Sequence, residues 1–205
     1  MNILAIDRST DTQSVALAKD GKVVSKVFAG MDSRSAEWPV KIREFVSSNG
    51  LSLQEIDKIL VGQGPGSFAG IRAALAFAQG LALPGDKPVF GLPSAMAFTR
   101  VGAKVAVVGD ARRERYWVVL FDGVKTVKDF TLTAKESLGQ SVPEGYTVVT
   151  PDGARIEPLL KAVFAESYGG ALVPLAGRLA EIAVSNPELL KPEPLPIYLS
   201  PAVRG

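Results

Sequence analysis

Two acidic residues that end apolar stretches of the chain are the first candidates for chemistry. Asp7 ends the first stretch and Asp110 ends a later one. A carboxylate at a strand end can serve metal-bound phosphates when the tight turn after it points backbone N–H groups at the anion. Glycine allows the close approach in such turns, but Arg8 follows Asp7 and Ala111 follows Asp110. We therefore favour ordinary turn acids, with a vestigial nucleotide contact through Asp7, Ser9 and Asp110 as the alternative.

A glycine-rich turn at residues 62–67 is the second candidate, as an anion site. Glycine turns that lead into a helix N-terminus bind phosphates, and Ser67 suits the N-cap of the helix that follows. The turn lacks the Lys-Ser/Thr pair of a P-loop, and we expect a meander before it instead of the βαβ unit of a dinucleotide fingerprint. These departures favour a structural turn over a phosphate cradle.

The helix expected at residues 68–83 is apolar on every side. Such a helix must be buried all round, and a small lobe has few layers to cover both of its sides. We therefore predict that one side rests on its own sheet and the other forms a protein interface. Complete burial within the monomer is the alternative. The predicted interface residues are Phe68, Ile71, Arg72, Leu75, Ala76 and Gln79, with Val40 from the preceding helix.

Three arginines, Arg112, Arg113 and Arg115, stand beside Tyr116 and Trp117. Arginines next to aromatic side chains can contact single-stranded RNA. A solvated loop whose aromatic side chains turn inward is the more ordinary interpretation, and we favour it here.

The composition excludes several kinds of active site. The 205 residues include no cysteine and no histidine, so catalytic triads and zinc sites that need these side chains cannot form within the chain. The formal net charge is +2, whereas a protein that holds nucleic acid alone needs a concentrated basic face. No metal site is expected.

The sequence favours a soluble, cytoplasmic protein. It begins without a basic segment followed by a long apolar run, as a secretory signal would need. The longest apolar stretch, residues 68–83, is interrupted by Arg72 and Gln79 and is shorter than the roughly 20 residues of a membrane-spanning helix.

Apolar runs and turn signals predict an α/β fold with mixed sheets. We expect strands at 2–7, 14–18, 22–28, 58–62, 89–91, 104–110, 116–121, 124–130 and 146–150. Helices are expected within 33–48, where Ser33 or Ser35 would be the cap and Pro39 would lie in the first turn, and at 68–83, 94–100, from about 155 and near 174–185. Residues 2–28 and 104–130 share one plan, which predicts two lobes of similar topology at 1–100 and 101–205.

Several segments resemble the TsaB (YeaZ) family of bacterial tRNA-modification subunits. The most specific is Gly-Pro-Gly-Ser-Phe-Ala-Gly-Ile-Arg at residues 64–72. Others lie in order along the chain, at 3–7, 79–82, 110–112, 116–117 and 196–199. Arg8 and Ala69 stand where the family usually has threonine, and a histidine common in the family is missing near residues 34–35.

The resemblance implies the actin-like ATPase (ribonuclease H-like) fold and a role in making threonylcarbamoyladenosine on tRNAs that read codons beginning with A. It implies an accessory subunit that is not itself an enzyme and pairs with the paralogue TsaD, which carries out the transfer. It further implies docking of the TsaE ATPase, a homodimer when the chain is alone, tRNA contact only through the complex, and ATP or ADP only in the complex.

Two other functions fit parts of the pattern. An ATP-dependent small-molecule kinase of the same fold would use Asp7 and Asp110. A metallopeptidase, a historical label of the family, would have to draw its metal ligands from aspartate and glutamate alone.

Overall fold

The computed structural model describes residues 1–28 and 37–199. These residues form two compact units. The first comprises Met1–Ala97 and Pro174–Ile197, and the second comprises Phe98–Val173 with the residues from Tyr198 on. Ser33, Ser35 and the position of the family histidine near 34–35 lie outside the described residues.

The first unit contains a six-stranded mixed sheet in the order β11-β5-β4-β1-β2-β3. The first three strands form the expected antiparallel meander, and β4 and β5 continue the sheet parallel to β1. The strands are β1 (Asn2–Asp7), β2 (Gln13–Lys19), β3 (Lys22–Phe28), β4 (Lys58–Gly62), β5 (Val89–Leu92) and β11 (Lys191–Pro192).

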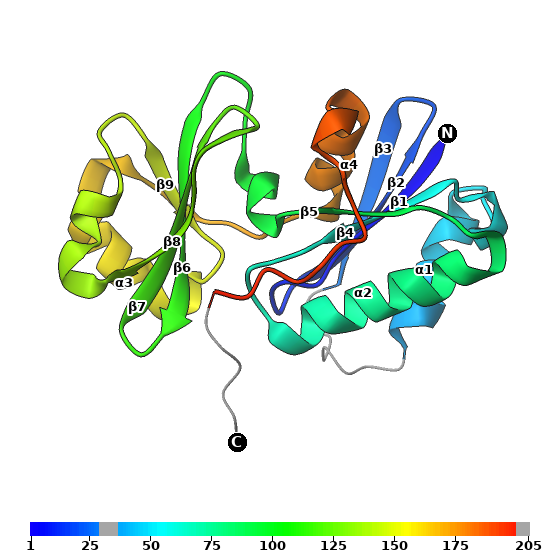
Figure 1. The fold of residues 1–205 in the computed structure, drawn as a ribbon, viewed down its shortest axis with the longest axis horizontal. Coiled ribbons are helices and arrows are strands. Elements are labelled where there is room, and N and C mark those ends of the chain that lie inside the picture. The colour runs from blue at the N-terminus through cyan, green and yellow to red at the C-terminus, as the bar shows by residue number, and fades with distance from the viewer. Residues whose placement is uncertain (29–36, 200–205) are drawn as a thin grey trace. The chain divides into compact units, whose positions relative to one another are not determined.

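Helices cover both faces of this sheet (Figure 1). The helices α1 (Trp38–Ser48) and α2 (Phe68–Ala82) share one apolar core with the sheet. The opposite face carries α4 (Ala176–Ser185), which packs against β1, β2, β3 and β4. Short 3-10 turns lie at Leu53–Glu55, Leu83–Gly85, Ser94–Phe98 and Pro187–Leu189.

Local sequence explains where these helices begin. Pro39 lies in the first turn of α1, as expected, and Glu37 is its N-cap residue. Ser67 caps α2 because its hydroxyl oxygen accepts the N–H of Gly70 at 3.2 Å. The helix expected at 94–100 is a single 3-10 turn.

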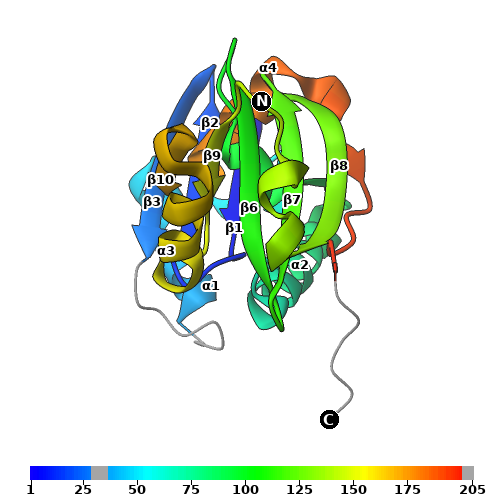
Figure 2. The ribbon, with the colours of Figure 1, turned by 90° about the vertical axis from the view of Figure 1, so that its left-hand side faces the viewer.

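The second unit contains a five-stranded sheet in the order β10-β9-β6-β7-β8, with α3 (Gly153–Phe164) against one face (Figure 2). Again three antiparallel strands come first, and parallel strands extend the sheet beyond the first of them. The strands are β6 (Lys104–Arg112), β7 (Arg115–Asp122), β8 (Lys125–Ala134), β9 (Thr147–Thr150) and β10 (Tyr168–Ala171).

The two units thus repeat one strand plan, which confirms the predicted fold class and repetition. The division along the chain differs from the one expected at residue 100. Residues 174–197 return to the first unit, because α4 is needed to cover the second face of that sheet. The N–H of Ala176 donates to the buried Ser14 hydroxyl at 2.8 Å, which fixes the start of α4 on β2.

Candidate functional site

The turn after β1 is built around the buried carboxylate of Asp7. Both the N–H and the hydroxyl of Ser9 donate to Asp7 Oδ1, at 2.9 and 2.7 Å. A side chain at Gly62 would overlap Asp7 Oδ2 and approach Ser94, so glycine is required beside the acid. Burial raises the pKa of Asp7, and hydrogen bonds from Ser94 and Ser9 oppose the rise. The structure therefore brings two of the predicted residues, Asp7 and Ser9, into one buried network.

The glycine turn packs directly on the chain that follows β1. The N–H of Ser67 donates to the carbonyl oxygen of Ser9 at 2.6 Å. A Cβ at Gly66 would overlap that same carbonyl group, and a Cβ at Gly70 would overlap the carbonyl oxygen of Arg8. The glycines thus serve close backbone packing, which supports the structural turn over the phosphate cradle.

One side of α2 is buried and the other is open, as predicted for an all-apolar helix. The residues on the exposed side, which we name the open face of α2, are Phe68, Ala69, Arg72, Ala76, Gln79, Gly80 and Leu83. Phe68 retains 44% exposure and Leu83, directly after the helix, retains 81%. The Arg72 guanidinium lies over the Phe68 ring at 5.0 Å. On α1, Val40 is also 44% exposed.

Two of the predicted interface residues are wrong. Ile71 and Leu75 belong to the core of the first unit, where they contact the sheet together with Ala74 and Ala78. Leu83 belongs to the open face and was missed. The sequence spacing could have identified it, because positions 68, 72, 76, 79 and 83 lie on one side of a helix.

Asp110, the third predicted nucleotide contact, lies in the second unit within a polar cluster. Its Oδ2 contacts Arg155 Nε at 2.9 Å, and its N–H donates to Asp152 Oδ2 at 2.8 Å. Arg155 also pairs with Asp152. Burial is the main cause that raises the pKa of Asp152, while the N–H of Asp110 and the charge of Arg155 oppose it. This cluster ties the end of β6 to the start of α3.

Two further findings bear on the candidate chemistry. Among residues 1–28 and 37–199, no group of three or more acidic side chains could hold a metal ion. In the same part of the chain, every helix is too short or too polar to cross a membrane.

Comparison with known proteins gives the family. A family profile described as "TsaD: tRNA N6-adenosine threonylcarbamoyltransferase" matches residues 33–175. The Escherichia coli "tRNA threonylcarbamoyladenosine biosynthesis protein TsaB" is 36% identical over 124 residues, which is 57% of this chain and 54% of that protein. The Haemophilus influenzae protein of the same name is 33% identical over 100 residues, 49% of this chain and 42% of that one. The chain thus spans about half the length of the curated relatives it matches.

A solved structure extends the likeness to the fold of the whole chain. The structure titled "YeaZ from Pseudomonas aeruginosa" matches with a TM-score of 0.78 at 23% identity and covers 97% of this chain and 99% of that one. It shows that the chain has the fold of that protein, and the expected actin-like, ribonuclease H-like fold fits the TsaD-type profile. From the profile, the relatives and the fold together, we conclude that the chain is a TsaB/YeaZ-type member of the TsaD-related family.

Proposed function

We propose that the chain is a non-catalytic subunit that pairs with a tRNA N6-adenosine threonylcarbamoyltransferase and supports its action on tRNA. The names of the curated relatives support a role in threonylcarbamoyladenosine biosynthesis. The absence of histidine and cysteine from the sequence supports an accessory role, because the side chains most often used in acid–base and covalent catalysis are not available.

The open face of α2 is the observation that carries this proposal. It joins an exposed aromatic ring, an exposed leucine and small residues on one side of a helix, with Arg72 as its single charge. Small residues let a second helix approach closely, and aromatic and arginine side chains are typical anchors of protein interfaces. The occupant that we propose is the transferase, which shares the family profile of this chain and so offers a helix of related design.

The test uses one substitution at two exposed helix positions. Ala76→Glu places a charge in the middle of the open face, and Ala162→Glu does the same on α3 of the second unit. We expect the wild-type chain and Ala162→Glu to co-purify with the transferase and to increase tRNA modification. Ala76→Glu should do neither. Equal stimulation by both variants would contradict the proposal.

The remaining partners and the two alternative functions lead to separate measurements. Without the transferase, we expect a homodimer through the same face, which Ala76→Glu should convert to a monomer in sedimentation. Docking of a TsaE ATPase on the pair, and nucleotide bound only in the complex, stay predictions. A kinase would bind Mg-ATP as an isolated chain in calorimetry, and a metallopeptidase would retain metal after purification. We expect neither.

A further inference from the structure

The hairpin between β6 and β7 has an unusual backbone for its sequence. Arg112, Arg113 and Glu114 all have positive φ, at 67°, 55° and 57°. The left-handed region is unfavourable for residues with a Cβ, and two-residue hairpin turns of this type prefer Asn-Gly or Asp-Gly. The β2–β3 turn of the same protein is Asp20-Gly21, with φ of 51° and 76°. The β6–β7 hairpin thus has charged residues at positions where asparagine or glycine would adopt the left-handed backbone with less strain.

The base of this hairpin is held firmly. The N–H of Arg112 donates to Asp110 Oδ1 at 2.7 Å, and Arg155 holds the same carboxylate from α3. Asp110 and Asp152, at the base of the hairpin, are therefore already paired with Arg155. Glu114, in the turn itself, is the remaining acid beside the three arginines of the tip.

Positive charge is concentrated at the tip. Residues 112–115 contain three arginines and one glutamate, a net charge of +2, which equals the formal charge of the whole chain. All four residues are exposed. The side chains of Arg113 and Arg115 form no ion pair or hydrogen bond with any other described residue, and Arg112 is 68% exposed despite a 3.6 Å contact with Asp110. The tip is therefore a positively charged surface, on which the side chains of Arg113 and Arg115 have no partner in the described part of the chain.

We propose that the β6–β7 hairpin binds the phosphate backbone of RNA. Guanidinium groups match phosphate oxygens in a two-point geometry, and backbone contacts of this kind position a nucleic acid without reading its sequence. The inference deepens the proposed function and rests on it, since that function brings tRNA to the complex. RNA is favoured over an acidic protein surface because the proposed function supplies an RNA partner.

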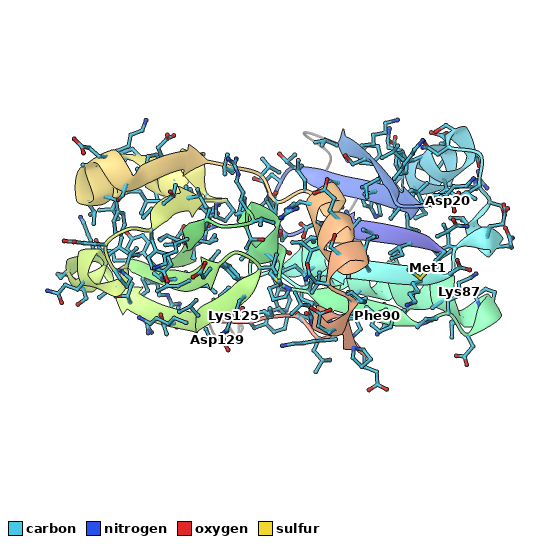
Figure 3. All side chains as sticks on the ribbon, turned by 90° about the horizontal axis from the view of Figure 1, so that it is seen from above. Met1, Asp20, Lys87, Phe90, Lys125 and Asp129 are labelled. Atoms are coloured by element: carbon cyan, nitrogen blue, oxygen red, sulfur yellow. The ribbon has the colours of Figure 1, made fainter. Side chains whose placement is uncertain are left out.

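The experiment measures the affinity of an unmodified tRNA transcript for the chain, alone and with the transferase, over a series of salt concentrations. The variant Arg113→Gln/Arg115→Gln removes two charges at the tip. Its control, Lys125→Gln/Lys128→Gln, removes two charges from β8, which begins beside the end of β7 that lies away from the hairpin. Lys125 is labelled in Figure 3. We expect the arginine variant to lose at least about fivefold in affinity and about 1.5 units of the salt slope, because it removes two charges and each phosphate contact contributes roughly 0.7–0.9 to that slope.

Two further measurements complete the test. The first distinguishes the effect of charge from that of the turn backbone, and the second distinguishes an RNA partner from an acidic protein partner. The variant Arg113→Asn/Glu114→Gly leaves the net charge unchanged, relaxes the turn and should unfold at a higher temperature while it binds tRNA less tightly. Polyglutamate should displace tRNA from the wild-type chain only at a higher concentration of charge than a competitor RNA needs. Equal tRNA affinity of the arginine and lysine variants would overturn the proposal, and so would equal competition by polyglutamate and RNA at matched charge.

The outcome for the hairpin is distinguishable from the outcome for the proposed function. If the chain stimulates the transferase but the arginine variant binds tRNA normally, only the hairpin proposal fails. If the hairpin binds tRNA but the chain leaves the transferase unaffected, the proposed function fails instead.

Discussion

The backbone N–H of Ser67 and the carbonyl oxygen of Ser9 form a 2.6 Å hydrogen bond that joins the N-terminus of α2 to the chain after β1. Gly66 and Gly70 permit this contact, because a side chain on either would overlap backbone atoms of residues 8 and 9. The position of the open face of α2 therefore depends on the same turn that contains the buried Asp7.

Two glycines of α2 should respond in opposite ways to substitution by alanine. Gly70→Ala should destabilise the protein by about 1–3 kcal/mol, because its Cβ would meet the Arg8 carbonyl oxygen, which cannot easily move. Gly80→Ala meets open space and should stabilise it by up to about 1 kcal/mol through helix propensity. Denaturant unfolding of both variants measures the difference. Equal effects would show that the α2–turn contact does not restrict the backbone.

Neighbouring residues of α2 should separate stability from association. Leu75→Ala removes a core side chain and should cost about 2–5 kcal/mol of unfolding free energy. Ala76→Glu changes an exposed position and should alter stability by no more than about 0.5 kcal/mol, while it abolishes self-association. Unfolding and sedimentation on both variants provide the check. A strongly destabilised Ala76→Glu chain would mean that position 76 is packed.

Replacement of the buried acid should make the protein more stable at neutral pH. Because the pKa of Asp7 is raised in the folded state, the folded protein holds that proton more tightly than the unfolded chain does. Stability from this group is therefore highest at low pH and falls as the pH rises from about 4 through the folded pKa. Asp7→Asn keeps an acceptor for Ser9, so it should be more stable than wild type at pH 7, with a difference that vanishes near pH 4. Lower stability of Asp7→Asn at pH 7 would indicate a cation paired with the ionised acid.

Loss of Arg155 should make the stability of the second unit depend more strongly on pH. Without its guanidinium, Asp152 faces Asp110 with Arg112 as the remaining cation, and the folded pKa of Asp152, which burial already raises, rises further. Arg155→Ala should therefore lose stability at neutral pH and recover part of it as the pH falls through the folded pKa of Asp152. Lys161→Ala, which removes a 3.0 Å pair with Glu157 on the surface of the same helix, should change little. A pH-independent loss in Arg155→Ala would point to packing instead of charge.

Apolar runs and clear turn residues between them made much of the fold predictable. Asp20-Gly21, a typical hairpin turn sequence, separates β2 from β3, and α2 lies between the expected cap Ser67 and Pro84. The strand β10 was missed because glycine is a poor strand former, and Gly169 and Gly170 lie in a strand that its other contacts with β9, on either side of an irregularity at Gly169, hold in place. The return of residues 174–197 to the first unit was missed because local patterns carry no information about which sheet a distant helix covers.

The candidate site was only partly predictable. An exposed apolar side of α2 is expected from its composition, but a helix that is apolar on every side has no polar stripe to show which side faces the sheet. Ile71 and Leu75 were therefore assigned to the wrong side, while Phe68, Arg72, Ala76 and Gln79 were assigned correctly to the exposed one. The ion pairs of Arg155 with Asp110 and Asp152 could not be predicted, because they depend on the pairing of β6 with β9. That pairing brings together residues that are over 40 positions apart in the sequence.

The late position of α4 in the sequence has a consequence for synthesis on the ribosome. The strands β1 to β4 emerge early, yet the helix that shields their second face emerges only after all of residues 98–173. The inserted second unit has every strand and helix of its own sheet in one continuous stretch, so it can become native first. Until then the nascent amino-terminal part keeps an uncovered apolar surface, and we expect aggregation to be favoured during this interval.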